Sequence, residues 1–253
     1  MCKGLDDFPQ VSLGGVTLYQ GDALDVLPRL GAVADLVVTD PPYKLSSGGN
    51  ATQVMGGLFS RGRYDNSGDL MDMVEWSDIG GPMYRAAKPD ADAYVMANDK
   101  QIFAAHGGMI GAGWKFHNLL VWNKGSPTRN RWYMKENEYV LYMWKGRAKR
   151  INAPGSKQTF HAARPKGDER IHVTQKPVDL LSHYIENSSA PGDLVLDPFA
   201  GSGATLVAAL RKGRRAIGVE FDPEIYQAAA ARIRAEADAL HENTAVRPET
   251  GSS

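Results

Sequence analysis

The chain has 253 residues, and its 29 Lys and Arg balance its 29 Asp and Glu, so the formal net charge is zero. With 43% hydrophobic and 23% charged residues, the composition is that of a globular protein and excludes collagen-like, disordered and disulfide-rich classes. The single cysteine, Cys2, can form neither an internal disulfide nor a zinc site. The sequence lacks an apolar run of the roughly 18 residues that a membrane span needs, and it opens without the apolar core of a secretory signal. A cytoplasmic location is therefore expected.

Seven short runs rich in β-branched and aromatic residues predict strands. In chain order they are residues 16–19, 36–39, 93–96, 119–122, 139–144, 194–196 and 216–219. Helical patterns fall between many of them, at residues 177–185, at 204–212 before Gly213, and at 225–241 after an N-cap at Asp222. Strands that alternate with helices predict an α/β fold with a mainly parallel, doubly wound sheet, in one domain over residues 1–253.

Two segments do not fit this scaffold. Residues 44–68 contain six glycines and few apolar residues, which predicts a long mobile loop, and such loops inside compact domains are usually functional or disordered. Residues 242–253 are polar and predict a flexible tail.

A glycine-rich turn follows the sixth predicted strand, in the run Asp197-Pro198-Phe199-Ala200-Gly201-Ser202-Gly203-Ala204-Thr205. The next strand leads to Glu220, 19 residues beyond Gly201, which is the spacing of an acid that binds the ribose of a nucleoside cofactor. A phosphate-binding loop would need a lysine in this turn, and a dinucleotide-binding motif would need a third glycine where Leu206 stands. A tight turn without a ligand is the remaining alternative.

A second motif, Asp40-Pro41-Pro42-Tyr43, comes directly after the second predicted strand. Two prolines remove two N–H donors and fix the backbone, which leaves carbonyl groups available. An acid, a free carbonyl and an aromatic ring are then expected at the carboxyl end of a parallel strand, where ligands bind in open α/β sheets. The alternative is a strand that the prolines simply end.

Together these motifs resemble those of the amino-group S-adenosylmethionine-dependent DNA methyltransferases, in the order typical of the β class. The resemblance rests on TDPPY (39–43), DPFAGSGAT (197–205) and QKP (175–177), supported by GDAL (21–24) and IGVE (217–220). It implies a Rossmann-like, doubly wound, seven-stranded class I methyltransferase fold with permuted motif order and a short recognition insert. It also implies S-adenosyl-L-methionine as cofactor, double-stranded DNA as partner and no metal. Because the family often dimerises, a homodimer is a further expectation.

The resemblance implies that Asp40, Pro41, Pro42 and Tyr43 form the catalytic motif. Hydrogen bonds from an exocyclic amine to the Asp40 carboxylate and the Pro41 carbonyl would free the amine lone pair, and Tyr43 would stack on a base flipped out of the duplex. Methylation of cytosine C5 is excluded because it needs a thiolate, and Cys2 lies outside every motif. An aspartate at the head of this tetrapeptide favours adenine N6 over cytosine N4.

Cofactor-binding roles follow from the same resemblance. Glu220 would bind the ribose, Asp22 the adenine amine, and Lys176 with Thr205 the carboxylate. The residues expected to bind the cofactor are Asp22, Ala23, Lys176, Asp197, Phe199, Gly201, Ser202, Gly203, Thr205 and Glu220.

The zero net charge conceals an uneven distribution. Residues 124–170 contain 12 Lys and Arg against 4 Asp and Glu, a net charge of +8 that leaves −8 for the rest. The resemblance implies a target-recognition segment at residues 145–172, and a solvated basic surface is the alternative. The residues expected to contact DNA are Arg129, Arg131, Lys145, Arg147, Lys149, Arg150, Lys157, Arg164, Lys166 and Arg170. Cytosine N4 methylation, methylation of RNA or of a protein amide, and non-catalytic DNA binding stay open as other functions.

Overall fold

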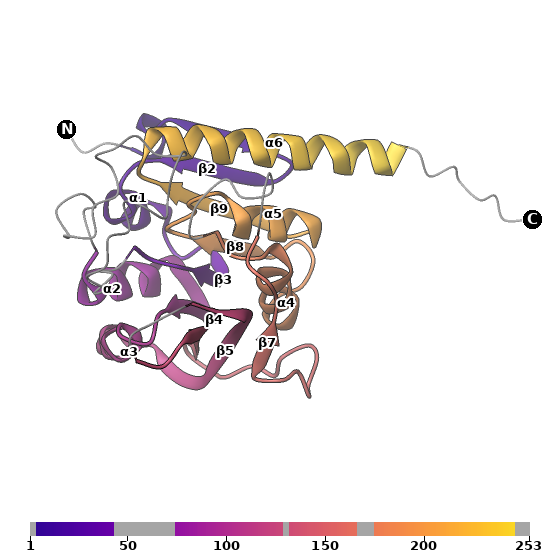
Figure 1. The fold of residues 1–253 in the computed structure, drawn as a ribbon. Helices are drawn as coiled ribbons and strands as arrows, with labels where there is room; N and C mark the ends of the chain where they lie inside the picture. The colour runs from indigo at the N-terminus through magenta and orange to yellow at the C-terminus, as the bar shows by residue number, and fades with distance from the viewer. Residues whose placement is uncertain (1–3, 43–73, 129–131, 166–174, 246–253) are drawn as a thin grey trace, which may run out of the picture.

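The computed structural model describes residues 4–42, 74–128, 132–165 and 175–245, and Figure 1 shows their fold. The glycine-rich loop predicted at residues 44–68 lies outside them. The described strands are β1 (Gln10–Leu13), β2 (Val16–Gln20), β3 (Ala34–Thr39), β4 (Ala87–Ala97), β5 (Lys115–Thr128), β6 (Lys135–Trp144), β7 (Thr159–His161), β8 (Leu194–Asp197) and β9 (Arg215–Glu220).

These strands form one sheet in the spatial order β1-β2-β9-β8-β3-β4-β6-β5-β7. All seven predicted strands are present. The predicted number is wrong, because the described residues form nine strands, with β1 and β7 added at the two edges of the sheet. The five neighbours from β2 to β4 are parallel, whereas β6 runs antiparallel to both β4 and β5. The predicted mainly parallel α/β sheet is confirmed.

Helices cover both faces of the sheet, as Figure 1 shows. One face carries α1 (Ala23–Leu30), α2 (Trp76–Ala86) and α3 (Ile102–Gly111), and the other carries α4 (Val178–Ser188), α5 (Ala204–Arg211) and α6 (Pro223–Ala245). The central strands are apolar on both sides, since Val37 of β3 packs in the first core and Leu36 and Val38 pack in the second. The doubly wound arrangement is therefore confirmed.

Local signals set several helix boundaries. The Asp222 carboxylate accepts hydrogen bonds of 2.7 and 3.1 Å from the backbone N–H groups of Glu224 and Ile225, so the predicted N-cap of α6 is confirmed. The helix continues to Ala245, and residues 242–245 therefore belong to α6 and not to the predicted tail, whose remainder lies outside the described residues. No helix within the described ranges is long and apolar enough to cross a membrane.

Gly218 on β9 permits the close packing of α5. A Cβ atom at Gly218 would lie 2.7 Å from Cδ2 of Leu206 and 3.0 Å from Cβ of Ala200. In dinucleotide-binding motifs the third glycine allows the helix to approach the sheet. Here Leu206 of α5 stands where that third glycine would be. The glycine that lets α5 pack closely against the sheet is instead Gly218, on the strand that Leu206 contacts.

The switch point of the sheet lies between β3 and β8. The chain leaves β3 toward α2 on one face, and it leaves β8 into α5 on the other. In open α/β sheets the ligand crevice lies at the carboxyl ends of the strands at such a point. The motif after β3 and the motif after β8 therefore meet where the parallel strands end. We call this end of the parallel strands the carboxyl edge, and the end where they begin the opposite edge; neither term refers to the outermost strands β1 and β7.

Candidate active site

A hydrogen bond joins the two motifs at the carboxyl edge. Thr39, the last residue of β3, donates its hydroxyl proton to Oδ1 of Asp197, the last residue of β8, at 2.7 Å. The backbone N–H of Phe199 donates to the same oxygen at 3.1 Å, and the Thr205 hydroxyl also bonds the carboxyl group. Burial raises the pKa of Asp197 to about 6, although these hydrogen bonds oppose the shift. The carboxyl group of Asp197 is thus fixed in one orientation.

The glycine turn after β8 is tied to the end of β9. Gly201 and Gly203 have positive φ angles of 51° and 73°, as the left-handed turn requires. The backbone N–H of Gly201 donates to Oε2 of Glu220 at 2.8 Å, and that of Asp222 donates to Oε1 at 2.9 Å. Among the described residues, a Cβ at Gly201 would have only the carbonyl oxygen of Phe199 within 4 Å, at 4.0 Å, so no described side chain blocks the approach of a ligand to the backbone of the turn.

This turn suits the nucleoside cofactor that the sequence implies. Each oxygen of Glu220 accepts one backbone N–H and retains lone-pair capacity for a ribose hydroxyl. Burial raises the pKa of Glu220, which is typical of a carboxyl group in a crevice. The residues present therefore fit a nucleoside cofactor.

Asp22 and Ala23 lie beside this turn. Gln20 of β2 pairs with Glu220, and the N–H of Gly21 donates to the Glu220 carbonyl at 3.0 Å. Oδ1 of Asp22 accepts from the N–H of Leu24 at 2.8 Å, so Asp22 caps α1, whose first residue is the buried Ala23. This capping role was not predicted, and contact of Asp22 with a cofactor stays a prediction.

Two other predicted residues are buried in or beside the turn. Ser202 is buried, and its carbonyl oxygen and Oγ lie 3.2 and 3.3 Å from Nη1 of Arg232 on α6, which donates to both. Phe199 is half-buried and packs against the first core. Both residues stabilise the turn, and their contact with a cofactor stays a prediction.

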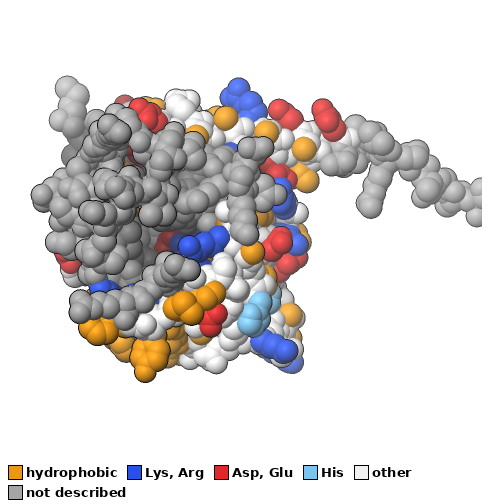
Figure 2. Space-filling view, in the orientation of Figure 1, with side chains coloured by type: hydrophobic (Ala, Val, Ile, Leu, Met, Phe, Trp, Pro, Cys, Tyr) orange, Lys and Arg blue, Asp and Glu red, His pale blue; other side chains and the backbone are white. Residues whose placement is uncertain are grey.

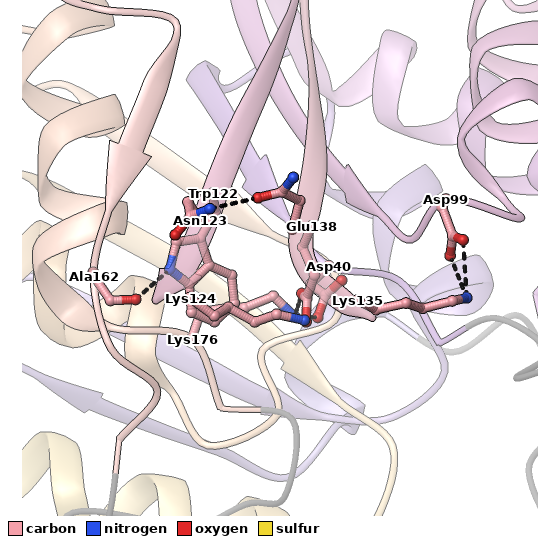
Figure 3. Close-up of polar contacts among 10 residues, drawn as sticks. Asp40, Asp99, Trp122, Asn123, Lys124, Lys135, Glu138, Ala162 and Lys176 are labelled. Carbon is pink, nitrogen blue, oxygen red and sulfur yellow. Dashed lines mark hydrogen bonds and ion pairs between the residues drawn. The ribbon is translucent and has the colours of Figure 1, made fainter. Parts of the chain in front are cut away.

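A second group of charged residues lies at the carboxyl edge (Figure 3). The Lys176 ammonium, just before α4, forms an ion pair with Oδ2 of Asp40 and lies 3.3 Å from Oε2 of Glu138. The other oxygen of Glu138, Oε1, lies 3.2 Å from Nζ of Lys124 on β5. Lys176, expected to bind the cofactor carboxylate, is thus paired with Asp40, the first residue of the predicted catalytic motif, in this structure.

Asp40 retains one unused acceptor. Its Oδ1 is buried and has no hydrogen-bond partner among the described residues. Burial raises the pKa of Asp40, and Glu138 raises it further, while the ion pair with Lys176 acts in the opposite direction. Asp40 therefore presents a buried carboxyl oxygen, next to Asp197, that a donor from outside the chain can satisfy.

Glu138 and Lys124 were not identified as site residues from the sequence. Lys124 comes two residues after a predicted strand, and Glu138 comes directly before another. Their contact depends on the antiparallel pairing of β5 and β6, in which Trp122 stands opposite Glu138. The sequence does offer one signal for this contact. The predicted strands 119–122 and 139–144 are consecutive, and an oppositely charged residue stands just after the first and just before the second.

The expected DNA contacts fall at two separate places. The Lys145 ammonium donates to the carbonyl oxygens of Tyr84 and Ala87 at 2.7 and 2.6 Å, and Arg147 pairs with Asp90 at 2.9 Å. These contacts involve the end of α2 and the start of β4, and hence the opposite edge. Lys149 and Arg150 lie between Arg147 and Asn152 in the chain. The backbone N–H of Asn152 donates to the carbonyl oxygen of Asn187 near the end of α4, so this stretch stays at the opposite edge.

Only part of the basic segment therefore lies near Asp40. Burial lowers the pKa of Lys124, and the nearby positive charge of Arg164, which follows β7, lowers it further. Lys157 precedes β7 and is exposed. On the part of the face that Figure 2 does not draw in grey, Lys and Arg side chains lie interspersed with Asp and Glu. The predictions for Tyr43, Arg129, Arg131, Lys166 and Arg170 fall outside the described residues, as does the end of the predicted 145–172 segment.

Comparison with known proteins identifies the family. Residues 34–231 match the family model N6_N4_Mtase, described as DNA methylase. YubD of Escherichia coli (strain K12), named as a methylase, is 30% identical over 233 residues, which cover 89% of this chain and 93% of YubD. The type II methyltransferase M2.DpnII of Streptococcus pneumoniae is 29% identical over 254 residues, covering 90% and 93%.

Among solved structures, the complex of M1.HpyAVI with SAM has a TM-score of 0.66 and 21% identity, and covers 86% of this chain and 98% of that chain. This likeness is one of fold. The match to the family model extends over both motifs and the strands that carry them. The chain therefore belongs to the N6_N4_Mtase family of DNA methylases.

Proposed function

We propose that the chain transfers a methyl group to N6 of an adenine that is flipped out of duplex DNA at a specific sequence. DNA is the polymer on which this family acts, and S-adenosyl-L-methionine is the methyl donor on which the family depends. The choice of adenine, the flipping of the base and the roles of individual residues are the parts that we add.

The unpartnered Oδ1 of Asp40 is the observation that supports this proposal most strongly. A buried oxygen without a donor is costly, and the amino group on C6 of adenine has N–H groups that would satisfy it. Within the family, an aspartate at the head of the tetrapeptide goes mostly with adenine. Inside a stacked duplex the amino group could not reach a buried carboxyl group, so the base has to leave the helix.

The reaction needs a nitrogen lone pair that the adenine ring otherwise delocalises. Hydrogen bonds from the amine to Oδ1 of Asp40 and to the Pro41 carbonyl would draw the nitrogen toward tetrahedral geometry and free that pair. They would also stabilise the positive charge that grows on nitrogen as the new N–C bond forms, before one proton is released to water. Pro42 would keep the backbone rigid, and Tyr43 is expected from the family resemblance to stack on the base.

The cofactor, when bound, supplies an electrophilic methyl group on a positively charged sulfur. Glu220 would accept hydrogen bonds from the ribose hydroxyls, and the backbone at Gly201, which has no side chain, would allow the cofactor to approach closely. Gly203 shapes the same turn, while Asp197 and Thr205 would hold the methionine end between the two motifs. Alignment of nucleophile and methyl group in one crevice then supplies much of the rate enhancement.

The test is to identify the modified base. The purified chain is incubated with S-adenosyl-L-methionine and unmethylated duplex DNA, and the digested nucleosides are analysed by mass spectrometry, with Asp40→Asn as the inactive control. N6-methyladenine is the expected product. N4-methylcytosine would overturn the base assignment, and methylation of RNA or of a protein amide without methylation of duplex DNA would overturn the substrate. Long-read sequencing of the product gives the recognition sequence.

A further inference from the structure

Glu138 lies at the centre of a chain of alternating charges that ends at the catalytic motif. Its two carboxylate oxygens contact different lysines, Lys124 at 3.2 Å and Lys176 at 3.3 Å, and Lys176 in turn pairs with Asp40 (Figure 3). The four charges sum to zero. None of the motifs recognised in the sequence includes Glu138 or Lys124.

Glu138 supplies a negative charge to both lysines. The side chains of Lys124 and Lys176 are only 5% and 8% exposed, and an ammonium group buried to this extent needs a counter-charge. Burial would raise the pKa of Glu138, but the two lysines outweigh that effect and lower it. Glu138 is therefore charged at neutral pH.

The backbone that carries Glu138 is firmly held. Glu138 stands opposite Trp122 in the β5–β6 pairing, and the next pair, Asn123 and Asn137, is joined by a side-chain hydrogen bond of 2.9 Å. The indole N–H of Trp122 also donates to the Ala162 carbonyl at 2.8 Å, which ties β5 to the segment after β7. A carboxylate on this frame can set the position of a flexible lysine side chain.

We propose that Glu138 is a positioning residue, whose carboxylate holds the Lys176 ammonium at the carboxyl edge so that Asp40 shares this cation and keeps Oδ1 for the substrate amine. The proposal rests on the function proposed above. Without Glu138, Lys176 would lose one of the two carboxylates that it contacts here, and the ammonium would no longer be held at the position that leaves Asp40 oriented for the base.

The charges around Asp40 give this role a signature. Lys176 and Glu138 act on Asp40 directly, Asp40 in turn acts on Asp197, and Arg164 acts on Lys124, the other lysine that Glu138 contacts. Glu138 raises the pKa of Asp40 through its negative charge. Glu138→Gln should therefore lower the pKa of Asp40, whereas Glu138→Asp keeps the charge on a shorter side chain.

The experiment measures kcat and KM across pH for the full chain and its variants. Glu138→Gln is expected to lose about tenfold or more in kcat and to shift the acid limb of the kcat profile to lower pH. Glu138→Asp should have a higher kcat than Glu138→Gln, and the acid limb of its kcat profile should lie at the same pH as in the unchanged protein. Asp99→Asn, which removes the exposed ion pair with Lys135 on the same hairpin, is the control and should change neither quantity.

An unmoved acid limb in Glu138→Gln, with kcat reduced only in proportion to the folded fraction, would overturn the proposal. Because Glu138→Gln leaves Lys124 buried without its partner, the double variant Lys124→Gln/Glu138→Gln is a second test, and it should show the same shift of the limb. If that variant folds with an unchanged limb, the proposal also fails.

A readout independent of methyl transfer separates this proposal from the proposed function. Urea unfolding of Glu138→Gln, Lys176→Met and their combination measures the coupling between the two side chains. We expect the loss of stability in the double variant to be smaller than the sum of the two single losses, and additive losses would argue against positioning. Inactivity of the unchanged protein on DNA, together with intact coupling, would refute the proposed function alone.

Discussion

The hydroxyl of Thr39 donates a hydrogen bond of 2.7 Å to Oδ1 of Asp197, a residue 158 positions later in the chain. The bond crosses the switch point of the sheet and joins β3, which precedes the Asp40–Tyr43 tetrapeptide, to β8, which precedes the glycine turn. Since both residues are buried, the bond is shielded from competing water. The relative position of the two motifs is therefore set by strand pairing and by a side-chain contact.

Asp40→Ala should abolish methyl transfer while cofactor binding is retained. The substitution removes the proposed acceptor of the substrate amine, and loss of such an electrostatic contact costs on the order of 100-fold or more in kcat. Lys176 keeps its contact with Glu138, so the edge is not left with an unpaired cation. Transfer of a radiolabelled methyl group and calorimetric binding of S-adenosyl-L-methionine measure the two quantities. Full activity of Asp40→Ala would refute the catalytic assignment.

Glu220→Gln should weaken cofactor binding more than it lowers kcat. The amide nitrogen that replaces one oxygen is a donor, and it would face the N–H of either Gly201 or Asp222. We expect Kd for S-adenosyl-L-methionine to rise about tenfold, equivalent to about 1.4 kcal/mol. Glu236→Gln, which breaks the ion pair with Arg211 between α5 and α6, is the matched control and should leave Kd unchanged. Equal Kd values for the two variants would count against a ribose-binding role.

Asp197→Asn should change how stability depends on pH. The pKa of Asp197 is about 6 in the folded chain against an ordinary value of 3.8, so the folded state binds more protons than the unfolded state between these values. Stability contributed by this group therefore falls as pH rises from about 4 to about 6. An asparagine does not ionise, so the Asp197→Asn variant does not lose this stability as pH rises. The difference in unfolding free energy, variant minus unchanged protein, should therefore increase by about 2 kcal/mol from pH 4.5 to 7.5. Parallel pH profiles in urea unfolding would contradict the raised pKa.

Much of the scaffold was predictable because its signals are local. The N-cap at Asp222 and the runs that form β3 and β8 depend on neighbouring residues alone. The edge strands β1 and β7 were missed because they are short and only partly buried, so their apolar pattern is weak. Pairing decides such strands, and pairing involves residues far along the chain.

The site divides along the same line. Asp40, Asp197 and Glu220 stand in motifs that can be read residue by residue. The contact of Glu138 with Lys176 cannot be read in this way, since it requires β6 to lie antiparallel beside β4 and the chain before α4 to return to the same edge. A charge count over residues 124–170 likewise grouped Arg147 with Arg164, although they lie at different edges of the sheet.

Gly218→Ala should destabilise the fold. The added Cβ would lie 2.7 Å from Leu206 Cδ2, and overpacking of this kind typically costs about 1–3 kcal/mol. Adding Leu206→Ala should recover part of the penalty that the new Cβ imposes, so the losses of the two single variants should not add. Gly107→Ala is the control, because a Cβ at this exposed helical glycine meets no atom of the described residues within 4 Å and should raise helix stability by up to about 1 kcal/mol. Urea unfolding measures all four variants.

Arg164→Ala and Arg147→Ala should differ in their effect on DNA affinity. Arg164 follows β7 and lies near Lys124, whereas Arg147 is paired with Asp90 at the opposite edge. We expect Arg164→Ala to weaken duplex binding and to reduce the slope of log Kd against log salt by about one, and Arg147→Ala to change neither. An equal loss in both variants would indicate that DNA contacts both edges.

The separation of Thr39 from Asp197 along the chain also orders events during synthesis. The ribosome releases the strand that carries Asp40 long before it makes the strand that carries Asp197, because 158 positions separate the two bonded residues. A nascent chain therefore contains Asp40 and β3 before it contains β8, the strand beside β3. A chain cut before β8 would keep Asp40 but would lack Asp197 and the glycine turn, and we expect it to transfer no methyl group to DNA.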